Sequence, residues 1–292
     1  MRKQAAHRPS SVVVVESLVN YRHGFHVGNH ADVLKHMALT YCLDRLKRKG
    51  TPFAVLDTHA GAGLYDLAGA QAQRSPEWQG GIAKIWGWKD APPLVASYLD
   101  AVRLFNADDA LSRYPGSPAL IAAALRASDV LIAVEKHPEE AAHLRERFAH
   151  IANVRVHERD AWEALPALLP PREKRGLVLI DPPYEQPDEL EAAARALGPA
   201  LKRFGHGIYL WWRPLKSASA LDAADAEARA QGARETLRAD FWIDTPKPEG
   251  KLMGSSLMLI NPPFGLADAL REAQPLLAQK LAVGDAGWRV SG

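Results

Sequence analysis

Short apolar segments alternate with segments of helical periodicity along most of this chain, and this alternation restricts the fold more than any other feature. The apolar segments expected to be strands are 52–56, 130–134, 154–157, 176–180, 207–211, 234–243 and 256–260. Such alternation is typical of a doubly wound, Rossmann-like α/β fold with helices on both faces of the sheet. We therefore expect a mostly parallel seven-stranded sheet.

The stretch from 65 to 115 interrupts this alternation. Its aromatic residues recur at helix-like spacings without a convincing strand, and include Trp78, Trp86, Trp88, Tyr98 and Phe105. We expect a helical insertion subdomain at 65–115, inserted into the Rossmann-like α/β domain formed by 21–64 and 116–292. Residues 1–20 are expected to be a disordered tail or a mispredicted start, because the apolar run Val12 to Val15 is shorter than the core of a signal peptide, about 7 to 15 residues.

Composition excludes several classes of protein. Lys and Arg total 36 against 34 Asp and Glu, so any nucleic-acid surface must be a local patch. The single cysteine, Cys42, excludes an internal disulfide and a four-cysteine zinc site, and fits a reducing cytoplasm. No segment reaches the roughly 20 apolar residues of a membrane span. We expect a cytoplasmic monomer without a membrane partner.

Acidic residues follow three successive expected strands, where ligands of open parallel sheets bind. Asp57 opens a turn in which Gly61 and Gly63 let the backbone pass close to a ligand. The carboxylate of Glu135 can accept hydrogen bonds from both hydroxyls of a ribose, and Asp160 can accept one from an adenine amine. A tight turn, a surface acid and a helix N-cap are the structural alternatives for these three positions.

The glycine turn does not continue as the phosphate-binding pattern Gly-x-Gly-x-x-Gly, because Leu64, Tyr65 and Asp66 follow Gly63. A ligand without phosphates is therefore favoured over NAD. S-adenosylmethionine is such a ligand, since it combines a ribose and an adenine with a charged methionine tail. We expect it as the cofactor.

The most specific motif is Asp181-Pro182-Pro183-Tyr184, directly after the apolar segment 176–180. The Asp181 carboxylate and the Pro182 carbonyl can each accept a hydrogen bond from an exocyclic NH2 group, while Tyr184 offers a ring on which a base can stack, worth roughly 1–3 kcal/mol. The lone pair of such an amine is delocalised into the base. Holding both protons restores it as a nucleophile, which is catalysis by positioning and electrostatics.

A near copy, Asn261-Pro262-Pro263-Phe264, follows the last expected strand. Enough of the chain remains after Asp181 to supply the further strands of the sheet, whereas almost nothing remains after Asn261. We therefore expect 261–264 to be the exit from the last strand rather than the reacting motif.

Residues 21–36 contain four of the eleven histidines. Two of these are spaced four apart, as metal ligands on a helix can be, but glycines in the same segment indicate a loop. We expect no metal and instead a mobile, partly basic segment that closes over cofactor and RNA, with Tyr21 available for stacking and Lys35 and His36 facing the cofactor.

With these residues in hand, the chain resembles the bacterial 23S ribosomal RNA adenine-N6 methyltransferases of the J type. The resemblance is carried by Tyr21 to His36, Leu56 to Gly63, Tyr114 to Pro118 and Leu179 to Tyr184. It implies a class I S-adenosylmethionine-dependent methyltransferase that modifies the N6 of one adenine in 23S rRNA, either naked or in an early assembly intermediate. It also implies a helical subdomain after the first strand.

The resemblance further implies roles for individual residues. Asp181 is the catalytic acceptor and Tyr21 meets the substrate. The cofactor site is lined by His36, His59, Ser117, Glu135, Asp160 and Ala161. Ala161 departs from the family, which commonly has Gly there.

Two other functions remain open. One is methylation of adenine in DNA, although no separate DNA-reading domain is visible. The other is a noncatalytic RNA-binding protein with a methyltransferase fold, against which the intact Asp181 and the glycine turn argue.

Overall fold

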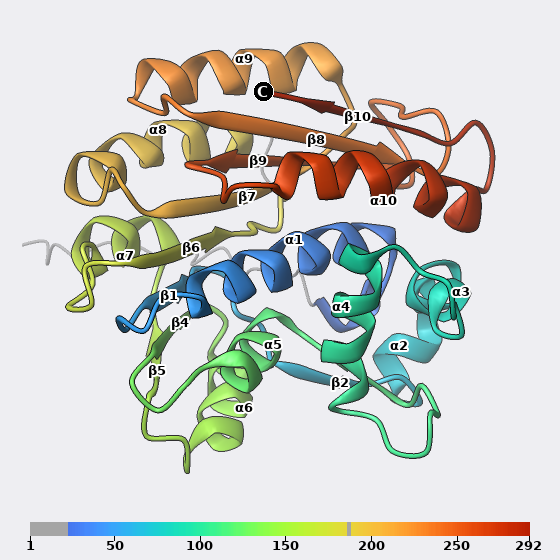
Figure 1. Cartoon of the computed structure of the whole chain (residues 1–292), viewed down its shortest axis with the longest axis horizontal. Coiled ribbons are helices and arrows are strands. Elements are labelled where there is room, and N and C mark those ends of the chain that lie inside the picture. Colours follow the sequence, from blue (N-terminus) through green and yellow to red (C-terminus); the bar gives the residue numbers. More distant parts are fainter. Residues whose placement is uncertain (1–22, 186–187) are drawn as a thin grey trace, which may run out of the picture.

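The computed structural model describes residues 23–185 and 188–292, in which an eight-stranded sheet forms the centre of the molecule (Figure 1). The strand order is β10-β8-β9-β7-β6-β1-β4-β5. The strands are β1 (Ala54–Asp57), β4 (Val130–Glu135), β5 (Val154–Glu158), β6 (Gly176–Ile180), β7 (Ile208–Pro214), β8 (Thr236–Trp242), β9 (Gly254–Ile260) and β10 (Gly287–Ser291). Neighbours from β5 to β7 pair in parallel, whereas β9 and β10 run antiparallel to the strands beside them.

The strand order reverses next to β1. The chain passes from β1 to β4 and β5 on one side and then returns to β6 on the other side. Crevices for ligands form at such a switch point, outside the carboxyl ends of the strands. We call the side of the sheet where β1, β4, β5 and β6 end the carboxyl edge, and the side where they begin the amino edge.

Helices cover both faces of the sheet, with a separate hydrophobic cluster on each. One face carries α1 (His30–Lys47), α5 (Ser117–Ala124), α6 (Pro138–Phe148) and α10 (Leu266–Leu281). The other carries α7 (Ala161–Leu168), α8 (Glu189–Arg203) and α9 (Ala218–Ala230). The fold class expected from the sequence is therefore confirmed.

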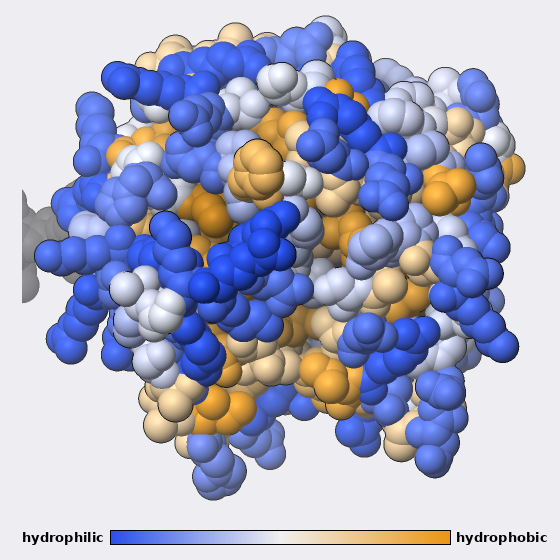
Figure 2. Space-filling model, viewed as in Figure 1, coloured by the Kyte–Doolittle hydropathy of each residue, from blue (hydrophilic) through white to orange (hydrophobic). Residues whose placement is uncertain are grey.

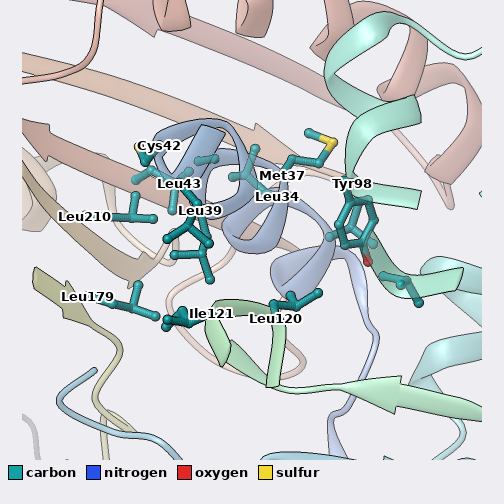
Figure 3. Close-up of a cluster of buried hydrophobic side chains, with 14 of the residues drawn as sticks. Leu34, Met37, Leu39, Cys42, Leu43, Tyr98, Leu120, Ile121, Leu179 and Leu210 are labelled. Atoms are coloured by element: carbon teal, nitrogen blue, oxygen red, sulfur yellow. The ribbon is translucent and has the colours of Figure 1, made fainter. Parts of the chain in front are cut away.

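Helix α1 lies at the centre of the larger cluster. The Asn29 side chain caps it by accepting from the backbone N–H groups of Ala31 (2.9 Å) and Asp32 (3.1 Å). Most of its residues are buried, as expected for a helix enclosed on several sides. Figure 3 shows its side chains between Leu179 and Leu210 of the sheet and Tyr98 of the neighbouring helix.

The region between β1 and β4 contains two strands that the sequence did not predict. Strands β2 (Leu64–Asp66) and β3 (Arg113–Pro115) pair antiparallel with each other, apart from the main sheet. The expectation of no strand was wrong because three residues are too few to show a period of two. The helices between them are α2 (Ala70–Arg74), η2 (Glu77–Gly80), α3 (Ile82–Ile85) and α4 (Pro93–Arg103). Their buried residues join the cluster around α1, so we interpret this region as an insertion packed on that helix.

The C-terminal region also differs from expectation. Helix α10 and strand β10 follow β9, so the sheet has eight strands and not seven. The segment 287–291 escaped prediction because none of its residues is fully buried and it lacks an apolar pattern. At the start of the described chain, a short helical turn, η1 (His23–Phe25), precedes α1. The expectations for residues 1–20 and for Tyr21 lie outside the described residues. No described helix is both long and apolar enough to cross a bilayer.

Candidate active site

A cavity of about 340 Å³ opens at the carboxyl edge of the sheet, beside the switch point. Nine of the residues predicted from the sequence line it, namely Lys35, His36, His59, Gly61, Ser117, Glu135, Asp160, Ala161 and Asp181. Four others, Asp57, Gly63, Pro182 and Tyr184, do not. The three acids at the ends of β4, β5 and β6 thus share one cavity, as expected from the parallel order of these strands.

Glu135 joins the glycine turn to the start of α6. Its Oε2 accepts a hydrogen bond from the backbone N–H of Gly61 (2.8 Å), and its Oε1 accepts one from that of His137 (2.7 Å). Gly61 and Gly63 adopt φ of 62° and 86°, which other residues reach only with strain. Burial raises the pKa of Glu135, although the two N–H groups oppose this effect. The carboxylate is held with its remaining lone pairs available to ligand hydroxyls.

Asp160 has two roles at once. It caps α7, since its Oδ1 accepts from the backbone N–H of Trp162 (2.8 Å), and its Oδ2 pairs with Lys136 (3.1 Å). Burial favours a higher pKa, but the Lys136 ammonium and the backbone N–H groups outweigh it and lower the pKa of Asp160. The N-cap predicted as the structural alternative is therefore present, and the residue lines the cavity as well.

His59 and Trp162 form an aromatic part of the wall. Their ring centroids are 5.5 Å apart in an edge-on arrangement. Burial lowers the pKa of His59 to about 4, so that the ring is neutral near pH 7. This part of the cavity is suited to a flat, uncharged group such as a base.

Asp57 lies beneath the cavity. It is fully buried and its Oδ2 accepts from the Ser117 hydroxyl (2.7 Å). Burial raises its pKa to about 7, while the Ser117 hydroxyl opposes the shift. The other oxygen, Oδ1, has no hydrogen-bond partner in the described part of the chain. Asp57 therefore positions Ser117, which lines the cavity at the start of α5.

Lys35 connects α1 with the end of β6. Its ammonium contacts Asp181 Oδ2 (2.5 Å) and Asp32 Oδ1 (2.8 Å), and its side chain is only 5% exposed. Burial alone lowers the pKa of Lys35, but Asp181 and Asp32 together raise it above its ordinary value. Lys35 lines the cavity, as predicted, and it also fixes the Asp181 carboxylate.

The loop after Asp181 places Tyr184 against β7. The Tyr184 hydroxyl accepts from Trp211 Nε1 and donates to the Trp212 carbonyl, both at 2.8 Å. This anchorage on β7 holds Tyr184 outside the cavity wall, whereas Pro183 and Glu185 lie in it. Two tryptophans within a strand carried no signal that could have revealed this contact from the sequence.

The insertion supplies cavity residues that sequence reasoning missed. Tyr65 of β2 lines the cavity directly. Tyr114 of β3 contacts His36 Nδ1 through its hydroxyl (2.9 Å) and stacks on the same ring. The available signal was the position of Tyr114 in the segment 114–118, on which the family resemblance rests.

The second motif, 261–264, lies at the amino edge and not near the cavity. Its strand, β9, runs antiparallel to β7, so the carboxyl end of β9 meets the start of β7. There the Asn261 side chain donates to the carbonyls of Gly205 (2.9 Å) and Gly207 (2.7 Å). The segment is the exit from β9, but β9 is not the last strand.

The chain has the fold of the class I S-adenosylmethionine-dependent methyltransferases, with a mostly parallel sheet and a cavity at the switch point. The family described as "Ribosomal RNA large subunit methyltransferase D, RlmJ" matches residues 50–291. The chain is 37% identical to Ribosomal RNA large subunit methyltransferase J of Escherichia coli K12, over 92% of this chain and 96% of that protein. It is 35% identical to the protein of the same name from Haemophilus influenzae, over 94% and 98%.

A solved structure, protein LPL1258 from Legionella pneumophila, superposes with a TM-score of 0.83 at 32% identity, over 91% of this chain and 98% of that one. The chain belongs to the RlmJ family of large-subunit ribosomal RNA methyltransferases.

Proposed function

We propose that this protein transfers a methyl group to the exocyclic N6 of an adenine in 23S rRNA, with the base held at Asp181-Pro182-Pro183-Tyr184. The observation that carries the proposal is the position of Asp181. It ends β6 in the cavity that Glu135 and Asp160 also line. An acceptor for an amine and acceptors for a nucleoside are thereby placed in one cavity.

The acidic residues fit S-adenosylmethionine. Glu135 is placed to accept from the ribose hydroxyls, Asp160 is placed to accept from the adenine amine, and the His59 and Trp162 rings offer an apolar wall. When bound, this cofactor supplies an electrophilic methyl group on a sulfonium. Asp57 supports the site from below through Ser117.

Asp181 would hold the target amine. Lys35 occupies Oδ2 of its carboxylate, whereas Oδ1 makes no hydrogen bond to another described residue and is available to an amine proton. The Pro182 carbonyl is the proposed acceptor for the second proton. The two hydrogen bonds draw the nitrogen toward tetrahedral geometry and direct its lone pair at the methyl group. The proton released afterwards goes to Asp181 or to water.

Tyr184 would support the base. Its hydroxyl is anchored by Trp211 and Trp212, which fixes the position of the ring. A base stacked there gains roughly 1–3 kcal/mol. Tyr21 remains the proposed substrate contact from the N-terminal segment.

Mass mapping of 23S rRNA from cells that lack the protein tests this proposal. We expect one adenine to be lighter by a methyl group, to be restored by the intact gene, and not to be restored by Asp181→Ala. Restoration by the Asp181→Ala protein would show that the reacting end of the sheet is misassigned. Methylation assays on rRNA and on duplex DNA separate the RNA from the DNA activity.

A further inference from the structure

The amino edge of the sheet, opposite the cavity, carries a concentration of positive charge that methyl transfer does not use. Eleven of the 36 Lys and Arg residues lie in the loops before β1, β4, β6 and β8 and in the last turns of α1 and α8, namely Arg45, Lys47, Arg48, Lys49, Arg126, Arg172, Lys174, Arg175, Lys202, Arg203 and Arg234. We call these residues the basic edge. Only four of the 34 acids, Asp44, Asp129, Glu173 and Glu235, accompany them. The rest of the chain therefore contains more acids than bases, although the whole carries +2.

Most cations of the basic edge are available to a partner. Seven are exposed, namely Arg48, Lys49, Arg172, Lys174, Lys202, Arg203 and Arg234. Within 23–185 and 188–292, none of these seven forms an ion pair, whereas Asp44 and Asp129 are paired with Lys47 and Arg126. Lys and Arg near helix ends complement the helix dipole, but Arg172, Lys174 and Arg234 lie in loops, where this explanation does not apply.

Hydrogen bonds join the loops of this edge into one surface. Arg126 donates to the Lys49 carbonyl and Arg175 to the Thr51 carbonyl, both at 2.9 Å. Both guanidinium groups also lie over the Phe53 ring, at 5.6 and 5.9 Å. The loops before β1, β4 and β6 are thereby held together. Figure 1 shows the end of α1 and the loops around it on the left of the view, and the same side of Figure 2 is largely hydrophilic.

The surface continues to the start of β7. His206 Nε2 contacts the Lys174 carbonyl at 2.8 Å. The Asn261 side chain joins the loop before β7 to the 261–264 motif through its hydrogen bonds to Gly205 and Gly207. Asn261 adopts φ of 53°, an unusual conformation that these two hydrogen bonds stabilise.

Phe264 projects from this surface. It is 91% exposed, more than any other large hydrophobic residue of the described chain. Its carbonyl accepts from the Tyr41 hydroxyl (3.1 Å), which in turn accepts from Arg45 Nη2 (2.5 Å). The exposed residue makes little contact with the rest of the fold and is therefore accessible to a partner outside the chain.

We propose that the basic edge is a second RNA-binding surface, which holds the phosphate backbone of the ribosomal RNA away from the reacting base while Phe264 stacks on an unpaired nucleotide. The proposal rests on the rRNA substrate of the family. Exposed cations distributed over several loops fit a polyanion, and an exposed aromatic ring among them fits an unstacked base. A large RNA is long enough to reach both edges of the sheet.

The test compares two charge-reversed full-length proteins in binding to a 23S rRNA transcript. Lys49→Glu/Lys174→Glu/Arg203→Glu removes three exposed cations of the basic edge. The matched control, Lys89→Glu/Arg155→Glu/Lys247→Glu, changes three exposed cations elsewhere. We expect the first protein to bind the transcript about tenfold more weakly, and its plot of log affinity against log salt to become shallower by about 2 to 3, because each phosphate contact contributes nearly one unit.

Equal affinities and salt slopes for the two variants would overturn the proposal. If the basic-edge variant keeps its RNA affinity but no longer self-associates, the surface binds a second copy of the chain instead. This result would also overturn the proposal. Calorimetry with S-adenosylmethionine checks that each variant is folded. The methylated nucleoside is identified in a separate assay. The binding experiment therefore remains valid even if the methyl group is not transferred to N6.

Phe264→Ala tests the stacking role. Loss of one stacked base weakens binding by about fivefold or more. Leu104→Ala is the control, because Leu104 is also exposed, at 73%, but lies at the end of α4 in the insertion. Equal affinities of these two variants would overturn the role of Phe264.

Discussion

Two similar segments, Asp181-Pro-Pro-Tyr184 and Asn261-Pro-Pro-Phe264, each follow a strand of the same sheet. The first lies at the carboxyl edge and the second at the amino edge. The first follows β6, a parallel strand, and opens into the cavity. The second follows β9, which runs antiparallel, and faces away from it. The direction of the preceding strand, rather than the motif itself, decides which of the two segments lies at the cavity.

The partners of the two segments differ as well. Asp181 is an acceptor held by the buried Lys35, whereas the Asn261 amide donates to two backbone carbonyls. The Tyr184 hydroxyl is anchored on β7, whereas the Phe264 ring is 91% exposed. One segment presents an acidic acceptor to the cavity, and the other holds a turn and presents an exposed aromatic residue.

The largest effect is expected from exchanging the acidic and amide groups of the two motifs. Asp181→Asn replaces an acceptor of the amine proton by a group that also donates, and lowers kcat by about 10²–10³-fold, as when one hydrogen-bonding group of a transition state is lost. Asn261→Asp introduces the same acid into the second segment, which does not lie at the cavity. Steady-state methylation of rRNA measures both, and recovery of activity in the double variant Asp181→Asn/Asn261→Asp would contradict the comparison.

Removing Lys35 affects the first segment next most strongly. Lys35→Met leaves Asp32 and Asp181 buried without their cation, which costs about 3–5 kcal/mol in the free energy of unfolding and also lowers activity. Urea unfolding of the full chain measures the stability. Adding Asp32→Asn removes one of the two uncompensated charges, so it recovers part of the stability but not the activity. If Lys35→Met unfolds at the wild-type midpoint, the ion pair does not have the role described.

The pH dependence of stability tests the group beneath the cavity. Burial raises the pKa of Asp57 from 3.8 to about 7, so between about pH 4 and pH 7 the folded chain retains a proton that the unfolded chain has lost. The contribution of Asp57 to the free energy of unfolding therefore decreases as the pH rises through this window.

Asp57→Asn removes this titration while keeping an acceptor for Ser117. We expect the variant to gain stability relative to the wild type as the pH rises, by on the order of 1–4 kcal/mol between pH 5 and pH 8. Parallel urea titrations of the two proteins give the difference directly. The same slope in both would show that Asp57 is ionised throughout.

The smallest effect concerns the hydrogen bond that anchors the Tyr184 hydroxyl, which has no counterpart at Phe264. Trp211→Phe removes the N–H group that donates to the Tyr184 hydroxyl, at a cost of about 0.5–1.5 kcal/mol, and the smaller ring adds a further cost because Trp211 is fully buried. If this anchor positions the base, KM for RNA increases about 2- to 10-fold at nearly constant kcat, while S-adenosylmethionine affinity is unchanged. A Tyr184→Phe protein should show the same change, and combining the two substitutions should add little. Additive losses would mean that Trp211 acts independently of Tyr184.

Much of this arrangement followed from the sequence. Buried strands such as 176–180 are continuous apolar runs, and parallel order brings Asp57, Glu135, Asp160 and Asp181 to one edge. Strand β10 and the short pair β2 and β3 were not predictable, because exposed or three-residue strands leave no periodic signal. The side-chain contacts Lys35 with Asp181 and Trp211 with Tyr184 join residues far apart in the chain, and no local pattern encodes them.

We propose that the site at the end of β6 directs methylation to an exocyclic amine of adenine. Incubation of the full chain with a 23S rRNA transcript and S-adenosylmethionine carrying an isotopically labelled methyl group, followed by digestion to nucleosides and mass spectrometry, tests it most directly. The expected result is label in N6-methyladenosine alone, and its absence with the Asp181→Asn protein. Label on a ribose hydroxyl or in another nucleoside would contradict the claim.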